Sequence, residues 1–349
     1  MQNTYSFNQT PIRTSISYNI NDIKLDNVSL PTQKKPFETA TMTKENVTLS
    51  NVQAMHPLTY GTGQVLQENM ALYCNSAYVV SPDAKDANFS IAYDFDENNA
   101  ELSNYLQVEA DKDMCVTVVF RSQTETPGFH QCILKVHVKN QAKVHVEVVN
   151  LLNEYTDHFL SIENTVEENA TLDMLFVDMG GKNSISNVYS NVVGEKGEVR
   201  TQTAYIGQNQ TLKDMNYIAH LRGKECGADM ELQGVLSDKA KKNLKFTIDF
   251  KQGCTGAVGK EMEACMLLSK DVRYRALPIL LCAEDNVEGA HSAAAGQVDP
   301  EQLFYIMSRG FTKKEAIKML VRAKYNKIIA EIHDHDLQQE IVAQLDRRL

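Results

Sequence analysis

The stretch Asn286–Gly296 is rich in glycine and alanine and carries a single imidazole, His291, among side chains too small to cover it. A neutral imidazole is a competent ligand for a transition metal such as iron, and the ordinary pKa of histidine, about 6.5, makes the neutral form common near pH 7. One histidine supplies only one ligand. The stretch therefore predicts a docking and ligand-presenting surface rather than a self-contained catalytic centre. The competing interpretation is a histidine that is merely hydrogen-bonded at the end of a strand.

Other histidines occur in patterns that favour structural roles. His333 and His335 alternate with aspartates between two predicted helices, where polar turn and capping residues are expected, so we interpret them as turn residues rather than metal ligands. His137 and His145 alternate with valine along predicted strands. That alternation favours solvent-facing or stacked side chains over ligands.

The segment Gly180–Ser184 resembles a phosphate-binding loop only superficially. A Walker A motif needs a glycine five residues before its Gly-Lys pair and a serine or threonine directly after the lysine. This chain has Phe176 and Asn183 at those positions. We therefore expect no nucleotide hydrolysis by this chain. The sequence also assigns no Ser-His-Asp or Cys-His arrangement, so we expect no enzyme activity.

Carboxylates offer a second class of chemistry, because a carbohydrate-active enzyme on a β-helix needs several of them in one cleft. Asp173, Asp178, Asp229 and Glu231 are the candidates for that alternative. The absence of a secretory leader counts against it.

Composition narrows the setting in which the protein works. The net charge is −10 and no basic footprint is visible, which argues against nucleic acid. Met1–Phe7 lacks the features of a signal peptide, and the longest apolar run, Ala276–Ala283, is far short of a membrane span. The seven cysteines are scattered and odd in number, as is typical of reduced thiols. We expect a cytoplasmic protein that binds no membrane.

The elements that would position His291 are predominantly strands. Residues 1–65 predict a polar, partly ordered arm, and residues 66–296 consist mainly of short alternating runs separated by turns. The small residues at four turns recur every 27 to 31 positions, at Ala142, Ala170, Gly197 and Ala228. A step of that size is typical of a β-solenoid, in which each coil buries its inward side chains against the next. A β-sandwich is the competing fold.

Residues 297–349 switch to helical patterns. Asp299 is a predicted N-cap, Pro300 suits the first helical position, Gln302 is placed to complete a capping box, and Gly310 can end the helix.

Two further helices are predicted to follow. The first opens with a Thr312–Glu315 capping box, and Asp336 caps the second. We expect this helical domain to pack on the β domain and to offer one face to a partner.

Several blocks of this sequence resemble the SufB/SufD family of iron–sulfur cluster assembly proteins. They are Met230–Ala240, Met266–Ser269, Ala276–Pro278, Glu284–Val287 and Asp299–Gly310, in an order and spacing that make a chance match improbable. The resemblance implies a right-handed parallel β-helix followed by a C-terminal helical domain. It also implies a scaffold that pairs with a SufB-type paralogue and binds the SufC-type ATPase. A homodimer remains an open alternative for the pairing.

The resemblance assigns expected roles to particular residues. It places His291 at or near a nascent iron–sulfur cluster, which is transient, shared with a partner and not held stably by this chain alone. ATPase docking is expected at Asp299–Leu320, through Asp299, Gln302, Leu303, Phe304, Met307, Arg309 and Gly310.

Within the family the sequence is closer to the SufD branch. His291-Ser292 stands where the SufB branch has His-Glu. Glu263 or Cys265 takes the place of the functional SufB cysteine, and their spacing keeps both on one face of a strand. The family's N-terminal helical region is expected to be shortened.

Overall fold

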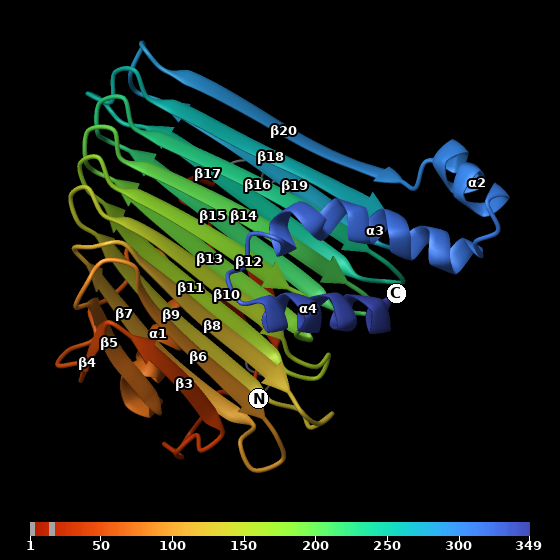
Figure 1. Ribbon diagram of the computed structural model, residues 1–349, viewed down its shortest axis with the longest axis horizontal. Coiled ribbons are helices and arrows are strands. Elements are labelled where there is room, and N and C mark those ends of the chain that lie inside the picture. Colours follow the sequence, from red (N-terminus) through yellow and green to blue (C-terminus); the bar gives the residue numbers. More distant parts are fainter. Residues whose placement is uncertain (1–3, 14–17) are drawn as a thin grey trace.

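The computed structural model describes residues 4–13 and 18–349, and its main body is a β-solenoid of about eight coils (Figure 1). From β5 onward the chain alternates between two nine-stranded sheets, so that each strand pairs in parallel with the strand two places along the sequence. This arrangement confirms the predicted mainly-β solenoid with C-terminal helices. The alternative β-sandwich is wrong, because a sandwich is built from antiparallel sheets.

We call one sheet the helix-side sheet, since the C-terminal helices cover it. Its strands are β3 (Ala40–Glu45), β6 (Ala87–Phe95), β8 (Met114–Ser122), β10 (Lys143–Leu151), β12 (Thr171–Asp178), β14 (Glu198–Gly207), β16 (Gly227–Leu236), β18 (Val258–Leu267) and β20 (Glu288–Gln297). The arm-side sheet faces the N-terminal segment. Its strands are β4 (Val47–Ser50), β5 (Ser76–Pro82), β7 (Glu101–Ala110), β9 (Phe129–Val138), β11 (Asp157–Val166), β13 (Asn183–Val192), β15 (Leu212–Leu221), β17 (Lys241–Phe250) and β19 (Arg273–Cys282).

The remaining elements lie outside this stack. They are the antiparallel pair β1 (Thr4–Phe7) and β2 (Ile23–Asp26), and the helices α1 (Gln64–Tyr73), α2 (Pro300–Ser308), α3 (Lys313–Ile329) and α4 (His335–Arg348). β3 and β4 close the N-terminal end of the stack by antiparallel pairing with β6 and β5.

A column of equivalent turns joins the arm-side strands to the helix-side strands. In each turn a residue with positive φ precedes a buried small residue at the corner. These pairs are Gln141-Ala142, Asn169-Ala170, Lys196-Gly197, Glu225-Cys226 and Gly256-Ala257. The predicted repeat is therefore real, but its fourth corner is Cys226. Ala228 lies two residues later, where it pairs with Val199 inside the sheet.

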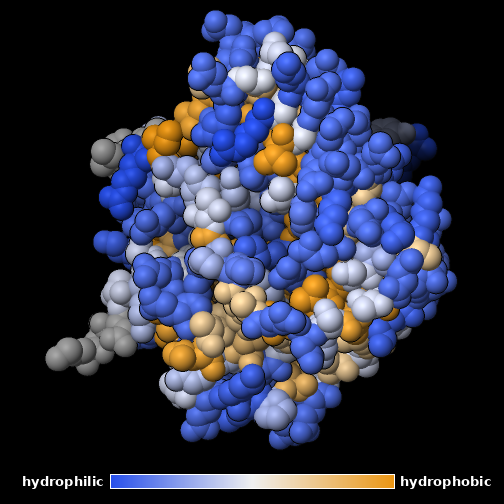
Figure 2. Space-filling view, turned by 90° about the vertical axis from the view of Figure 1, so that its left-hand side faces the viewer, coloured by the Kyte–Doolittle hydropathy of each residue, from blue (hydrophilic) through white to orange (hydrophobic). Residues whose placement is uncertain are grey.

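The turns leave little continuous apolar surface. Figure 2 views the molecule from the side of Figure 1 on which these turns lie, and that face is mainly hydrophilic, with apolar side chains in separate patches.

Both outer faces of the solenoid are partly covered. α3 and α4 lie across the helix-side sheet (Figure 1), where Val321, Tyr325 and Ile341 pack against Val149 and Ile206. The N-terminal segment and α1 cover part of the arm-side sheet. Phe7 and Leu66 pack there against Phe159, and Met70 packs against Tyr105.

The predicted helix signals were correct in most places. Asp299 caps α2 with Pro300 in the first turn, Thr312 and Glu315 form a reciprocal capping box, and Gly310 has φ +96°. The Asp299 carboxylate accepts from the amide of Glu301, one position earlier than the predicted capping box requires.

Two features of the helices differ from the prediction. The cap of α4 is Asp334 rather than Asp336, and it accepts from the amides of Asp336 and Leu337. Either aspartate suits an N-cap, and the helix begins at the earlier one. The sequence did not predict α1, because its apolar positions do not form a clear stripe.

Candidate functional site

The C-terminal end of the stack carries an uncovered strand. β20 pairs with β18 on one side and forms the edge of the helix-side sheet on the other, and all ten of its residues are exposed. It is the uppermost strand in Figure 1. Its central side chains are mostly alanine and glycine, so the backbone groups along this edge are accessible for pairing.

His291 lies in the middle of β20, directly in register with Glu261 of β18. The two side chains share the inward face because paired residues of parallel strands point the same way. Glu261 is 1% exposed, and among the described residues neither carboxylate oxygen has a hydrogen-bond partner of ordinary geometry. Burial raises the pKa of Glu261 to about 8, and backbone groups of Ile248 and Ile279 oppose the shift only in part.

Glu263 lies one inward position further along β18, in a satisfied polar cluster. Its carboxylate accepts hydrogen bonds from the hydroxyls of Tyr205 and Tyr274, each at 2.6 Å, and forms an ion pair with Lys242. The Lys242 ammonium also lies 4.2 Å from the centroid of the Tyr274 ring. Burial lowers the pKa of Lys242, and the Glu263 charge opposes this.

The cluster around Glu263 requires a glycine at position 234 of β16. A Cβ built on Gly234 would lie 2.0 Å from Cζ of Tyr205, so only glycine lets this ring extend across β16 to reach Glu263.

Cys265 points to the same interior as Glu263, which agrees with their spacing in the sequence. Both residues are buried, Cys265 being 4% exposed. Burial raises the pKa of the Cys265 thiol to about 11. The thiol is therefore protonated at neutral pH. The Glu263 carboxylate already accepts a hydrogen bond on each of its two oxygens.

α2 projects from the end of β20, beyond the two sheets (Figure 1). None of its residues is buried, and Phe304, Tyr305 and Met307 are 74%, 58% and 41% exposed. The Arg309 guanidinium packs over the Tyr305 ring and donates to its hydroxyl. Asp299, Gln302, Arg309 and Gly310 are also exposed, and Leu303 is half-buried.

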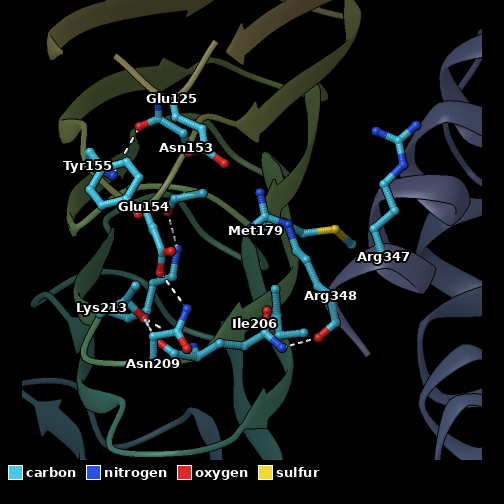
Figure 3. Close-up of a pocket in the computed structure, with 14 residues that line it drawn as sticks. Glu125, Asn153, Glu154, Tyr155, Met179, Ile206, Asn209, Lys213, Arg347 and Arg348 are labelled. Atoms are coloured by element: carbon cyan, nitrogen blue, oxygen red, sulfur yellow. Dashed lines mark hydrogen bonds between the residues drawn. The ribbon is translucent and has the colours of Figure 1, made fainter. Parts of the chain in front are cut away.

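A cavity of about 470 Å³ lies beside the Gly180-Gly181 segment (Figure 3). Its walls mix the acidic Glu125 and Glu154 with the basic Lys213, Arg347 and Arg348.

The positively charged side chain beside these glycines, Lys213, already has hydrogen-bond partners within the protein. The Lys213 ammonium donates to Asp178 and to the carbonyl of Gly180. A Cβ on Gly180 would lie 2.4 Å from the backbone of Leu152. That glycine therefore allows close packing between coils and is not part of a phosphate cradle.

The carboxylates considered for carbohydrate chemistry do not act together. Asp173 is paired with Arg200, Asp178 with Lys213, and Glu231 with Lys327. The fourth candidate, Asp229, is exposed, and three carboxylates neutralised by separate cations do not form the convergent pair that acid–base catalysis needs.

Sequence reasoning located His291 but missed Glu261, Lys242 and the two tyrosines around Glu263. The Glu261–Ala264 segment alternates charged and apolar residues, and the apolar positions would ordinarily be assigned to the core. Here Met262 is 45% exposed and the two glutamates face inward. The register with Met230 and Leu232 of β16 sets this parity. The sequence of β18 by itself does not show which of its residues face the interior.

Comparison with protein families matches residues 93–324 to the family domain described as "SUF system FeS cluster assembly, SufBD core domain". Among curated proteins, the chain is 24% identical over 262 residues to the iron–sulfur cluster assembly protein SufD of Bacillus subtilis. That alignment covers 74% of this chain and 60% of that protein. It is 24% identical over 255 residues to the protein of the same name in Escherichia coli, covering 72% of this chain and 60% of that protein.

A third relative is an iron–sulfur cluster assembly SufBD family protein of Pyrococcus horikoshii. It is 27% identical over 208 residues, which cover 59% of this chain and 46% of that protein. The chain thus spans about 60% of the length of the two SufD relatives. Among the residues described here, no helix has the length and apolarity needed to cross a bilayer.

Proposed function

Because this chain belongs to the SufBD family of iron–sulfur cluster assembly proteins, we propose that it is a non-catalytic, SufD-like scaffold subunit of a cytoplasmic SUF complex. In this role it pairs with a SufB-type paralogue through β20 and binds a SufC-type ATPase through α2. A nascent iron–sulfur cluster is then built at the paired edge. The observation that carries the proposal is the exposed β20, with His291 above the unpartnered Glu261.

The edge of β20 supports pairing with another chain. A long strand with an open edge and small side chains lets a partner strand approach and form main-chain hydrogen bonds. β20 is exposed along its whole length, and its side chains from Ser292 to Gly296 are all small. The partner is a SufB-type subunit in our proposal, and a second copy of this chain is the alternative that the same edge would also accept.

His291 and Glu261 support a cargo site at this edge. An imidazole provides one neutral nitrogen ligand, and iron–sulfur clusters otherwise depend mainly on thiolates. The remaining ligands in our proposal come from the partner. The buried Glu261 carboxyl lies directly beneath the imidazole, and a cation bound there would favour its ionised form, for which the described residues provide no counter-charge.

The exposed face of α2 supports docking of the ATPase. Large aromatic and methionine side chains at such a position are typical of interface anchors. Phe304 and Met307 project from a helix that adds nothing to the core of the solenoid.

The cluster site is tested by anaerobic co-expression with SufB-type and SufC-type partners, followed by iron and sulfide analysis. His291→Ala should weaken iron retention by at least about tenfold, the scale of losing an outer contact to a metal. Ser292→Ala is the matched control, because it alters the neighbouring residue on the opposite face of β20. Equal iron content in the wild type and His291→Ala would reject the ligand role.

Docking is tested by measuring ATPase affinity for a Phe304→Ala/Met307→Ala variant. Loss of two anchors should cost at least about 2 kcal/mol, which is roughly a 30-fold rise in Kd. Leu72→Ala serves as the control, since Leu72 is 68% exposed on the distant α1. An unchanged Kd in the double variant would remove α2 from the interface.

A further inference from the structure

A second group of ligand-type side chains lies on the outer face of the helix-side sheet, at the seam with the helical region. Cys115 of β8 and His145 of β10 are paired directly across the sheet. One outward position further along, Thr117 and Glu147 form the next pair. His333, from the turn between α3 and α4, completes the group from above.

These groups converge at short range. One ligand atom each from Cys115, Glu147 and His333 lies within 4.8 Å of the other two. Nδ1 of His333 is 2.9 Å from Oε1 of Glu147, and Nε2 of His145 is 3.2 Å from the same oxygen. The His145 nitrogen is buried and makes no aligned hydrogen bond with any described residue. The other Glu147 oxygen accepts from the Thr117 hydroxyl at 2.7 Å.

The charge at the centre of this group lacks a fixed positive partner. Glu147 is fully buried, and within residues 4–13 and 18–349 no lysine or arginine forms an ion pair with it. Within the described residues, its only ion-pair candidates are the side chains of His145 and His333. Oε1 of Glu147 also accepts from the backbone amide of His333 at 2.7 Å, and a bound cation would add the full positive charge that this amide and the Thr117 hydroxyl do not supply.

A cation could reach the group from solvent. An open cavity of about 350 Å³ is lined by Cys115, His145, His333 and Asp173. The His333 side chain is 55% exposed and the His145 side chain 16%. The site is therefore buried on the sheet side and accessible on the other.

We propose that Cys115, His145, Glu147 and His333 bind a divalent transition-metal ion of the zinc or ferrous class. One thiolate, two imidazoles and one carboxylate match the ligand types and the tetrahedral number that such ions take. Metal–ligand bonds of about 2.0–2.3 Å place the ligand atoms roughly 3.3–3.8 Å apart. The atoms of Cys115, Glu147 and His333, which lie within 4.8 Å of one another, therefore move closer together on binding, and the His145 ring, 3.2 Å from Glu147, moves in as the fourth ligand. The thiol proton is released to solvent as the metal–sulfur bond forms.

The bound ion would fasten the turn between α3 and α4 to the sheet. The site is separate from the cluster site, because β10 and β20 are five strands apart in one sheet, or about 24 Å at ~4.8 Å per strand. The two histidines of the His333–Asp336 segment thus differ in role. His335 begins α4 and bonds to Gln338 and Gln339, whereas His333 reaches the sheet.

The test is titration of the chelator-treated full chain with Co²⁺, which gives a near-ultraviolet charge-transfer band only when a thiolate binds it. The wild type should bind one equivalent with this band, and Cys115→Ser should lose the band. His333→Ala should weaken binding by more than the roughly 10- to 100-fold expected for Thr117→Val, which alters only an outer contact to Glu147.

Matched controls are Cys282→Ser, at the exposed cysteine, and His335→Ala, at the neighbouring histidine. Both should bind Co²⁺ as the wild type does. Circular dichroism checks that each variant is folded, and competition with Zn²⁺ and anaerobic Fe²⁺ ranks the two ions.

A second measurement follows the turn itself, since metal should slow amide exchange at residues 330–336 in the wild type but not in His333→Ala. Absence of the thiolate band in the wild type, or its persistence in Cys115→Ser, would overturn the proposal.

Discussion

The Glu261 carboxyl lies inside the solenoid, where no charged side chain among the described residues pairs with it, and this burial makes the stability of the protein depend on pH. Its pKa is about 8 in the folded chain, against an ordinary value of 4.5. Between these values the folded state retains a proton that the unfolded state has lost. Stability therefore falls as pH rises from about 5 to 8.

We predict that Glu261→Gln removes this pH dependence. The free energy of unfolding of the variant, relative to the wild type, should increase by about 1.4 kcal/mol per pH unit between pH 5 and 7. Denaturant titration at several pH values measures it. The difference between the two proteins is the useful quantity, because buried histidines such as His158, with a pKa lowered to about 4 by burial, add the opposite slope to both. A constant difference would mean that the folded carboxylate is ionised and paired.

At the scale of single elements, the corner turns repeat one backbone conformation with different side chains. Gln141, Asn169, Lys196 and Glu225 all have φ between +52° and +68°. Asparagine and glycine tolerate this region, whereas a lysine or glutamate is strained there. The turn geometry is therefore imposed by the stacking of coils, in which each turn amide bonds to the turn of the next coil, as Lys196 does to the carbonyl of Lys224.

We predict that Lys196→Gly stabilises the protein by about 0.5–1 kcal/mol, because glycine relieves the strained φ. The exposed ion pair of Lys196 with Glu225, at 3.7 Å, contributes too little to reverse the sign. Lys224→Gly is the control, since Lys224 lies outside the left-handed region and should lose stability instead. The midpoint of urea unfolding reports both effects. A loss of stability in Lys196→Gly would show that the lysine side chain supports the corner.

The elements also show what the sequence could predict. Small corner residues such as Ala142 and Ala170 repeat at a fixed step, so the solenoid and the strand content were predictable from local pattern. The sequence pattern placed the fourth corner at Ala228 because it searched for alanine and glycine. The corner residue is the buried Cys226, whose small side chain fills the same role. Cap chemistry predicted α2 and α3, but at the start of α4 two aspartates, Asp334 and Asp336, both suit an N-cap.

The candidate site was only partly predictable, for a related reason. His291 stood out among small residues, whereas Glu261 becomes meaningful only through its pairing with His291 across two strands that lie thirty residues apart. The group around Glu147 joins residues separated by 186 positions. Contacts over such separations follow from coil stacking and helix docking, and neither is encoded in a short window.

For the whole molecule, stability is shared between neighbouring coils, so the end coil is the weakest. β13 and β15 have paired strands on both sides and buried outer faces, whereas β20 is exposed throughout. We predict that amide hydrogen exchange is fast along β20 and slow along β13 and β15. Binding of a partner at the edge should slow exchange of alternate β20 amides by at least about tenfold, as main-chain bonds form. Protection that appears only on α2 would place the partner elsewhere.

The two ends of the β-solenoid differ, and this difference limits how many molecules can assemble through them. At one extremity, β3 is short, runs against its neighbour and carries Lys44 and Glu45, while at the other β20 is long and bare. The β20 end of each solenoid can therefore pair with a strand of another molecule, whereas the β3 end disfavours such pairing. When two such molecules pair through β20, neither has a second β20 edge for a third molecule. Assembly through this edge therefore stops at a dimer and does not continue into a filament.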